Sequence, residues 1–289
     1  MRHIKTALFY IILTIGAASM IFPFLWMILT SVKPEAEIFA KTITFHNILP
    51  SHWLWSNYVK AMQAAPFGRY FFNTVVVSVG GTAIMLVVSS MAAYAFARLR
   101  FPGRQWLFLT LLATMMIPAQ VTMIPSFIIL RHIPLFGGNN LMGSGGHGWL
   151  NNFLGLIVPG AAGAFGIFML RQFFQTLPRE MEDAGRIDGA TESTIFWRII
   201  MPLSKPALAA LGTFAFTSRW NDFMGPLLIM SDDSMKTLQI GLQVFQSQYT
   251  AQWDLLMAGT VLVTLPVILV FLFGQRYFVS GITMGGVKG

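Results

Sequence analysis

Residues 71–97 read FFNTVVVSVGGTAIMLVVSSMAAYAFA, a stretch of 27 residues without a charged side chain. A helix needs about 20 mostly apolar residues to cross the hydrocarbon core of a bilayer. The residues that follow include Arg98, Arg100 and Arg104. Because membrane proteins concentrate Lys and Arg in cytoplasmic loops, the stretch predicts a transmembrane helix that ends on the cytoplasmic side.

The composition of the whole chain agrees with a membrane environment. Of its 289 residues, 55% are hydrophobic and 10% are charged, whereas soluble domains carry about 25% charged residues. So few charges do not cover a globule of this size in water. We therefore predict an all-α membrane protein with six transmembrane helices, near residues 7–30, 71–97, 106–130, 153–174, 207–229 and 255–273.

An even number of spans places both termini on one side of the membrane. If that side is the cytoplasm, most of the 19 Lys and Arg residues fall in inner segments, as the distribution of basic residues in membrane proteins requires. These residues are Arg2, Lys5, Arg98, Arg100, Arg104, Arg171, Arg179, Arg186, Arg198, Lys205, Arg276 and Lys288. The first span is longer than a signal-peptide core, so we expect it to be retained.

Several chemical functions are excluded by the residues present. The chain has no cysteine, which removes disulfides, thiolate metal sites and thiol nucleophiles. It has no His-Glu-x-x-His and no Gly-x4-Gly-Lys-Ser/Thr phosphate loop. We expect no catalytic residue, no metal site and no cofactor bound by this chain. The net charge of +8 is explained by cytoplasmic loops, so nucleic acid is not an expected partner.

The inner loop between the fourth and fifth spans has a pattern typical of two short helices. Residues 177–190 read LPREMEDAGRIDGA, and the loop continues to IIMP at residues 199–202. Pro178 and the acidic residues after it favour a helix start, and Asp188-Gly189 is expected to break that helix. Thr191 is expected to cap a second helix and Pro202 to end it. The loop mixes acidic and basic residues, which favours a protein partner over a resting place on an anionic membrane surface.

This loop resembles the coupling loop of binding-protein-dependent ATP-binding-cassette permeases. The family pattern is Glu-Ala-Ala, three residues, Gly, nine residues, Ile, one residue and Leu-Pro. The matching positions are Asp183-Ala184-Gly185, Gly189, Ile199 and Met201-Pro202. Asp183, Gly185 and Met201 depart from the pattern, and Gly185 is expected to loosen the helix by up to about 1 kcal/mol relative to Ala.

Further segments resemble the carbohydrate branch of the family, which includes the second maltose permease subunit and glycerol-phosphate permeases. They are SVKP at 31–34, FPGR at 101–104, AGRIDGA at 184–190, WNDF at 220–223 and GITMGGVKG at 281–289. The resemblance therefore covers nearly the whole chain. It implies a type I importer transmembrane fold with six helices and cytoplasmic termini, in the cytoplasmic (inner) membrane of a bacterium.

The resemblance also implies that this chain works in a transporter made of several different chains. This chain and a second permease subunit, expected to be a different chain, would form the pore for a carbohydrate or related solute. An extracellular solute-binding protein would deliver that solute, and two ATPase subunits would bind ATP and Mg. The permease itself would not be an enzyme.

The expected organisation is a single permease domain over residues 1–289. It would consist of a first helix and outer segment (1–68), a five-helix core (69–276) that includes the coupling loop (175–206), and a cytoplasmic tail (277–289). The expected ATPase-docking residues are Glu182, Asp183, Ala184, Gly185, Arg186, Asp188, Gly189, Ile199 and Pro202. Gly285, Gly286 and Lys288 of the tail are expected to reach the ATPase pair as well.

The fifth span contains the polar run Ser218 to Asp222. Arg219 and Asp222 are three residues apart, so they share a helix face and are expected to pair. If the run lies at membrane depth, Trp220 and Asn221 suit a sugar, one by stacking and one by hydrogen bonding. The alternative is that the run lies at the outer interface, beyond a shorter span. Arg219, Trp220, Asn221 and Asp222 are thus candidates for the translocation path.

Two other functions remain as alternatives to an importer subunit. A stand-alone secondary transporter would move its solute with an ion gradient, but it leaves the acidic and basic inner loop without a role. An intramembrane enzyme would need a catalytic constellation at membrane depth, and the sequence offers none.

Overall fold

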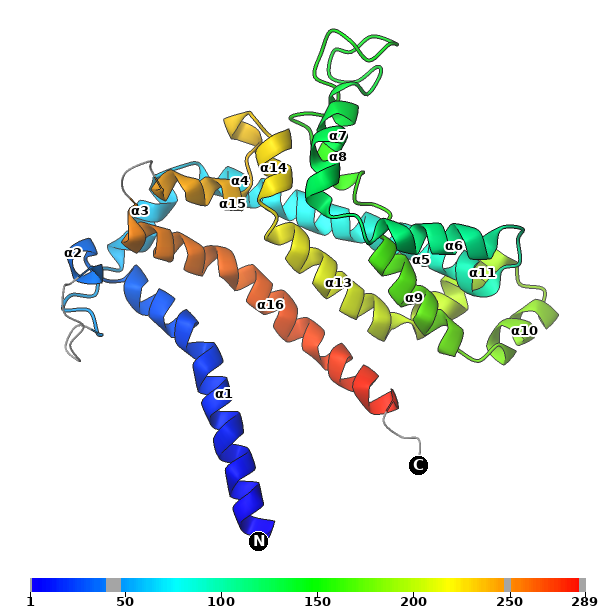
Figure 1. Ribbon diagram of the computed structural model, residues 1–289, viewed down its shortest axis with the longest axis horizontal. Helices are drawn as coiled ribbons and strands as arrows, with labels where there is room; N and C mark the ends of the chain where they lie inside the picture. Colours follow the sequence, from blue (N-terminus) through cyan, green and yellow to red (C-terminus); the bar gives the residue numbers. More distant parts are fainter. Residues whose placement is uncertain (1, 40–47, 247–250, 286–289) are drawn as a thin grey trace. The chain divides into compact units, whose positions relative to one another are not determined.

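The fold is described from a computed structural model that covers residues 2–39, 48–246 and 251–285, except for the side chains of Arg2 and residues 277–285. Every regular element of these residues is a helix (Figure 1). The predicted all-α class is confirmed. The chain divides into two compact units. One unit comprises Met1–Gly68 and Ile240–Pro266, and the other comprises Arg69–Gln239 and Val267–Gly289.

The helices follow one another along the whole described chain. The α-helices are α1 (Arg2–Ser31), α2 (Glu35–Ile38), α3 (Ser56–Gln63), α4 (Phe67–Val75), α5 (Gly81–Arg98), α6 (Arg104–Thr114), α7 (Ala119–Arg131), α8 (Phe153–Ile157), α9 (Ala164–Thr176), α10 (Glu180–Ile187), α11 (Glu192–Ile195), α12 (Met201–Leu203), α13 (Lys205–Trp220), α14 (Met224–Ile229), α15 (Leu238–Gly241) and α16 (Trp253–Gly285). Short π-helical turns span Val76–Gly80 and Phe196–Ile200, and 3₁₀ turns span Asp233–Met235 and Leu242–Phe245.

The expected spans differ in how continuous they are. Among the described residues, three helices are long and apolar enough to cross a membrane alone, namely His3–Ser31, Phe67–Arg98 and Trp253–Arg276. The number rises to five if the bent pairs Arg104–Thr114 with Ala119–Arg131 and Glu192–Leu203 with Lys205–Trp220 each count as one span. The fourth expected span, 153–174, is divided between α8 and α9. All six expected segments are therefore largely helical. The third, fourth and fifth of them (106–130, 153–174 and 207–229) are each built from two helices.

Proline and glycine explain where these spans break. The helices α6 and α7 meet at an angle of 101°, and Pro118 stands immediately before the first residue of α7. Proline disfavours the helical conformation of the residue before it and donates no hydrogen bond, so a helix ends there at low cost. Pro159, Gly160 and Gly163 fill the connection between α8 and α9, where the same argument applies.

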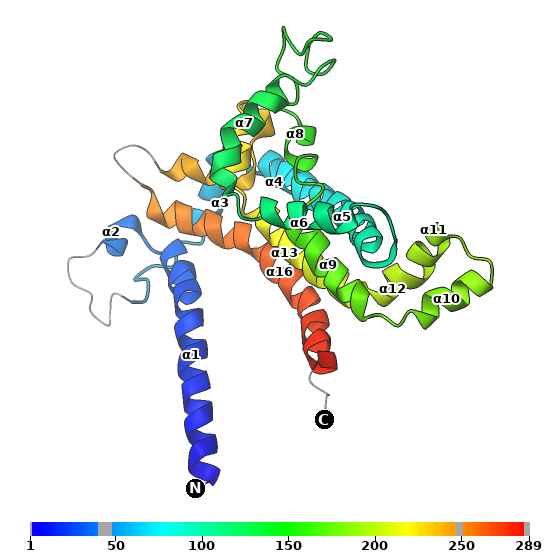
Figure 2. The ribbon, with the colours of Figure 1, turned by 45° about the vertical axis from the view of Figure 1, so that its right-hand side comes forward.

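The larger unit has its core where α5 packs along α9 and α13, which lie side by side in Figures 1 and 2. Ala93, Ala97 and Ser89 on α5 are buried. A β-carbon at Gly166 of α9 would lie 3.0 Å from Met85 and 3.2 Å from both Ser89 and Leu211. Small residues thus let the three helices approach closely.

The π turn Val76–Gly80 separates two parts of one long span. Before it, the buried Asn73 donates hydrogen bonds to the carbonyls of Ser234 (2.9 Å) and Lys236 (2.8 Å). Thr74 accepts one from the backbone N–H of Leu238 at 2.9 Å. These contacts fasten the segment 234–238 to the beginning of the span.

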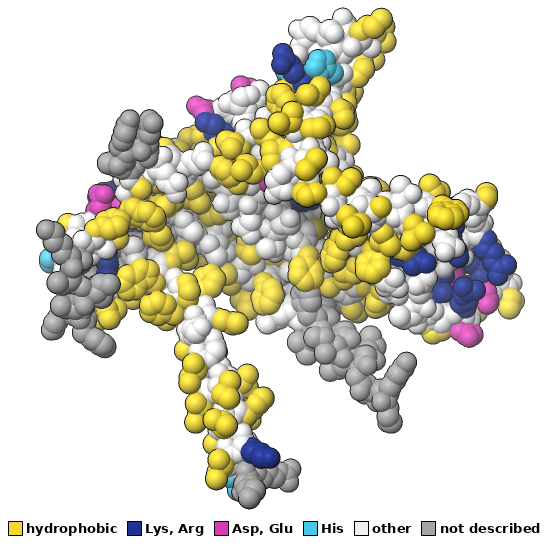
Figure 3. Space-filling model, viewed as in Figure 1, with side chains coloured by type: hydrophobic (Ala, Val, Ile, Leu, Met, Phe, Trp, Pro, Cys, Tyr) yellow, Lys and Arg dark blue, Asp and Glu magenta, His cyan; other side chains and the backbone are white. Residues whose placement is uncertain are grey.

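In the smaller unit, α3 is fastened to the end of α1. The buried amide of Asn57 donates to the carbonyls of Ser31 (3.1 Å) and Lys33 (3.2 Å), and the hydroxyls of Ser31 and Tyr58 lie 2.8 Å apart. Most of the apolar side chains of α1 are exposed within this chain (Figure 3). Because such a surface is unfavourable in water, α1 requires lipid or a partner chain around it.

Replacing Asn57 by Ala should destabilise the smaller unit. The substitution leaves two buried carbonyls without their donor, which costs about 1–3 kcal/mol. Denaturant unfolding in detergent micelles measures this loss, with Gln63→Ala, an exposed change on the same helix, as the control. Equal stability of the two variants would show that Asn57 does not hold α3 to α1.

Candidate functional site

The helix α10 begins as its sequence predicts. Glu180, Glu182 and Asp183 lie in its first turn, where carboxylates interact favourably with the positive end of the helix dipole. Pro178 lies two residues before the first helical residue, so it precedes the helix instead of forming part of its first turn.

The end of α10 is fixed by one glycine. Gly189 has a φ of +79°, a conformation that a β-carbon disfavours by about 1–2 kcal/mol. The N–H of Ala190 bonds to the carbonyl of Gly185 (2.9 Å), and the N–H of Gly189 bonds to that of Arg186 (3.1 Å). This is the Schellman arrangement of hydrogen bonds. The predicted break at Asp188-Gly189 is confirmed, and its cause is the left-handed residue.

The second helical segment is longer than predicted. Thr191 caps it, with its hydroxyl accepting from the N–H of Thr194 at 3.3 Å. The segment continues through the π turn Phe196–Ile200 and α12 to Leu203, so the prediction that Pro202 ends it is wrong. The N–H of Met201 bonds to Phe196, five residues back. This widened turn lets the chain pass Pro202 in helical form before it bends at Ser204.

Gly185 has a packing role that the sequence analysis missed. A β-carbon there would lie 3.0 Å from Cδ1 of Ile199 and 3.4 Å from Cγ1 of Ile195. The absence of a side chain therefore lets α10 lie directly on the second segment. Glycine still lowers the intrinsic stability of the helix, but the close contact with two isoleucines offsets that cost.

A buried ion pair fastens α10 to the end of α5. The Nε of Arg98 lies 2.7 Å from Oε1 of Glu182, and the two side chains are 4% and 3% exposed. Arg98 also donates from Nη2 to the carbonyl of Leu177 at 2.6 Å. Burial raises the pKa of the Glu182 carboxyl, while Arg98 and Arg186 act in the opposite direction. In the sequence, Arg98 indicates only the cytoplasmic side, and its partner Glu182 is 84 residues further along the chain.

A second set of contacts closes the two helical segments on each other. The guanidinium of Arg186 lies 2.9 Å from both Asp183 and Glu192, and 3.6 Å from Glu182. The hydroxyl of Tyr94 on α5 donates to Glu192 at 2.6 Å. Charged side chains gather at this end of the molecule (Figure 3). We call residues 177–203 the hairpin, which Figure 2 shows as α10 beside α11 and α12.

The predicted docking residues divide between two faces of the hairpin. Glu182 is buried against Arg98 of α5, and Gly185 is buried against the second helical segment, where Ile199 is half-buried. The exposed members are Asp183, Ala184, Arg186, Asp188, Gly189 and Pro202. Met181 and Ile187 share the exposed face, and the side chain of Ile187 is 86% exposed. Met181 and Ile187 were not predicted as docking residues. The available signal was an apolar side chain on a helix that is otherwise rich in acidic residues.

A separate cavity contains three of the polar residues of α13 and the turn after it. Its volume is about 530 Å³, and its lining includes Ser218, Arg219 and Asp222 together with Met85 of α5 and Gly160. Arg219 donates from Nη2 to the carbonyl of Gly160 at 2.7 Å. The expected partner, Asp222, instead accepts from the N–H of Gly225 at 3.2 Å.

Two glycines provide the space for the Arg219 side chain. A β-carbon at Gly81 or at Gly160 would lie 2.7 Å from a guanidinium nitrogen. The guanidinium thus lies between the backbone of Gly81 and that of Gly160, and it also lines the cavity.

The Trp220 ring, a candidate for sugar stacking, is buried within the larger unit. Trp220 is 1% exposed, with its ring 5.3 Å from Phe216 and 5.9 Å from Phe71. Its faces are covered by aromatic side chains of the same unit. Asn221 is exposed and accepts a hydrogen bond from Gln239 at 3.2 Å. The helix α13 ends at Trp220, so Asn221 and Asp222 follow a span shorter than 207–229.

The remaining predicted contacts lie at the C-terminus. Gly285 is the last residue of α16, whereas Gly286 and Lys288 lie outside the described residues. Within the part of the chain that the structure describes, no group of three or more His, Asp or Glu side chains is placed to hold a metal ion.

Comparison with known proteins gives consistent matches over most of the chain. Residues 85–284 match the family model of the binding-protein-dependent transport system inner membrane component. The arabinooligosaccharides transport system permease protein AraQ of Halalkalibacterium halodurans is 35% identical, covering 96% of each chain. The lactose transport system permease protein LacG of Rhizobium radiobacter is 31% identical, covering 99% of this chain and 98% of the relative.

A solved structure agrees with these sequence matches. A crystal structure of a bacterial ABC transporter that imports the acidic polysaccharide alginate contains a chain similar to this one, with a TM-score of 0.80 and 25% identity. The match covers 96% of this chain and 97% of the other. With the family model spanning residues 85–284, these findings show that the chain is a non-catalytic permease and belongs to the family of binding-protein-dependent transport system inner membrane components.

Proposed function

We propose that this permease passes a carbohydrate through the membrane after an extracellular binding protein delivers it. Two relatives are named for arabinooligosaccharides and lactose, and the similar structure belongs to an alginate importer. Saccharides are common to all three. A second permease chain would complete the pore, and separate ATPase subunits would bind ATP and Mg.

The observation that carries this proposal is that α5 joins the hairpin to the cavity. At its C-terminal end, Arg98 holds Glu182. Near its N-terminal end, Gly81 lies against the Arg219 side chain, and Met85 lines the cavity together with Arg219. The 18 residues of α5 span about 27 Å at a rise of 1.5 Å per residue. A displacement of the hairpin is thus delivered directly to the wall of the cavity.

The hairpin is the proposed docking element for an ATPase subunit in the cytoplasm. Its inner face is fixed to α5 by buried contacts, and its outer face offers Ile187, Met181 and Asp183 to a partner. A fixed inner face and an exposed outer face suit a coupling element, because a partner that binds the outer face can move α5 through the inner face. Gly285, Gly286 and Lys288 are proposed as a second contact with the ATPase pair.

The Arg98–Glu182 pair should be required for coupling. Arg98→Met leaves a carboxylate buried without its close cation, and breaking a buried pair in this way costs about 3–5 kcal/mol. We expect loss of ATP-driven uptake in proteoliposomes and loss of the co-purifying ATPase. Arg100→Met, an exposed change two residues beyond the end of α5, should retain both.

The double variant Arg98→Met with Glu182→Leu sharpens this test. It removes both charges, so it should be less destabilised than either single variant. If each single variant transports as well as the unmodified protein, the pair has no part in coupling.

The outer face of the hairpin should determine ATPase docking. Ile187→Asp places a charge in the proposed apolar contact, and ATPase co-purification should fall at least tenfold while thermal stability in detergent stays unchanged. Met142→Asp makes the same change at an equally exposed side chain of another loop and should have no effect on docking. Normal ATPase recovery with Ile187→Asp would place the contact elsewhere.

The cavity should affect transport without affecting docking. Arg219→Gln removes the charge that faces the cavity and weakens the bond to Gly160. We expect solute uptake to decrease while the ATPase still co-purifies, and Ser218→Ala serves as a milder change in the same lining. Simultaneous loss of uptake and ATPase would indicate a purely structural role for Arg219.

A further inference from the structure

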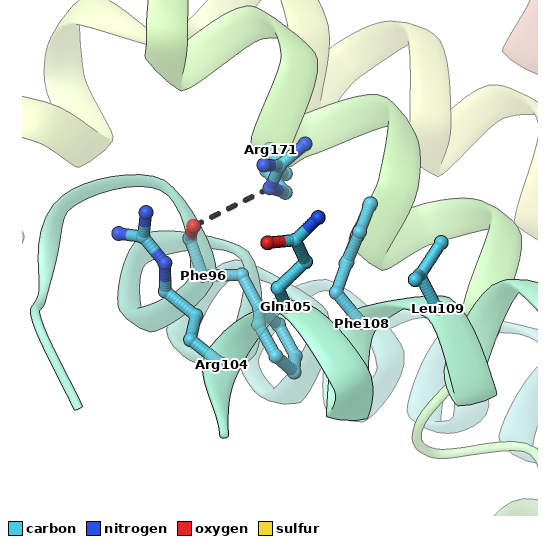
Figure 4. A pocket seen from close by; sticks show the side chains of 6 residues that line it. All are labelled: Phe96, Arg104, Gln105, Phe108, Leu109 and Arg171. Atoms are coloured by element: carbon cyan, nitrogen blue, oxygen red, sulfur yellow. Dashed lines mark hydrogen bonds between the residues drawn. The ribbon is translucent and has the colours of Figure 1, made fainter. Parts of the chain in front are cut away.

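A second cavity lies beside the hairpin end of the larger unit, between α5, α6 and α9. Its volume is about 330 Å³, and Phe96, Arg104, Gln105, Phe108, Leu109 and Arg171 line it. Figure 4 shows these side chains, which come from the end of α5, the first turns of α6 and the middle of α9. The cavity is distinct from the one that contains Arg219.

Two cations face this cavity without an acidic counterpart. None of its six lining residues is Asp or Glu, and neither arginine forms an ion pair with any residue that the structure describes. Two like charges around one cavity repel each other. An anion bound between them would relieve that repulsion, and each guanidinium has five N–H donors for it.

Neutral contacts hold both arginines in place. The guanidinium carbon of Arg171 lies 4.1 Å from the centre of the Phe108 ring, and its Nε donates to the carbonyl of Phe96 at 3.3 Å. Arg104 donates from Nη1 to the carbonyl of Leu99 at 2.9 Å. Each contact orients a guanidinium but leaves its charge unbalanced and most of its donors free for a ligand.

The start of α6 adds further attraction for an anion. Arg104 is the first residue of this 11-residue helix, and Gly103 before it has no side chain to cap the first turn. The positive end of the helix dipole favours negative charge. The cavity thus combines two guanidiniums with the positive end of a helix.

An apolar surface continues from the cavity along α6. Trp106, Leu107 and Leu109 are exposed within this chain, Trp106 to 76%. A ligand that satisfies both regions has an anionic group at one end and hydrocarbon at the other. In an inner membrane, anionic phospholipids have this chemistry.

We propose that this cavity binds the phosphate of an anionic phospholipid, with Arg104 and Arg171 on the phosphate oxygens and the acyl chains along Trp106 and Leu109. Arginine is suited to phosphate because its planar fork makes paired hydrogen bonds. Phe96, two residues before Arg98 on α5, lines the site, so bound lipid would steady the end of α5 at its junction with the hairpin. Free phosphate shares the headgroup chemistry and is separated from lipid by the test.

The test measures lipid retention on the purified, assembled transporter by native mass spectrometry. Dioleoylphosphatidylglycerol should be retained in preference to dioleoylphosphatidylcholine. Arg104→Gln and Arg171→Gln should each reduce this retention about fivefold, which corresponds to one basic side chain at an anionic membrane surface. Arg100→Gln removes an exposed arginine of the same loop outside the cavity and should leave retention unchanged.

Three results would overturn the proposal. They are equal retention of the two lipids, equal loss in Arg100→Gln and Arg104→Gln, and displacement of the lipid by millimolar inorganic phosphate. The last result would assign the cavity to a soluble anion. Because Arg171 also packs on Phe108, its variant is checked for folding by thermal melting, and Arg104→Gln provides the decisive comparison if that variant fails to fold.

Discussion

The ion pair between Arg98 and Glu182 joins the membrane part of the larger unit to the surface hairpin. Both side chains are almost fully withdrawn from solvent, so neither charge is tolerated without the other. The pair fixes the position of α10, and the Arg186 contacts then hold the second helical segment against it. The proposed docking face, the packing of Gly185 and the proposed path to the cavity all follow from that fixed position.

Much of the fold was predictable because lipid imposes strong rules on sequence. Long apolar runs and clustered arginines identified the helical segments and their order. The breaks at Pro118 and at Pro159 within two of these spans were not predicted. A hydropathy pattern gives the length of an apolar segment but does not distinguish one straight helix from two bent ones.

The candidate sites show a similar division. The turn at Gly189 followed from local sequence alone, since one glycine in a left-handed conformation determines it. Arg219 bonds to Gly160, 59 positions away, and Arg98 bonds to Leu177, 79 positions away. No local sequence pattern records contacts over such distances. Arg219 was therefore paired with its neighbour Asp222 in sequence, whereas the folded chain offers it a carbonyl and two glycines.

The π turn Val76–Gly80 has a geometrical consequence for the cavity. A π turn accommodates one residue more than an α-helical turn, and each α-helical residue advances the side-chain direction by about 100°. The extra residue thus sets the phase between the upstream face, where Asn73 binds Ser234, and the downstream face, where Gly81 admits Arg219. A uniform α-helix that kept Asn73 in place would rotate Gly81 by about 100° away from the guanidinium.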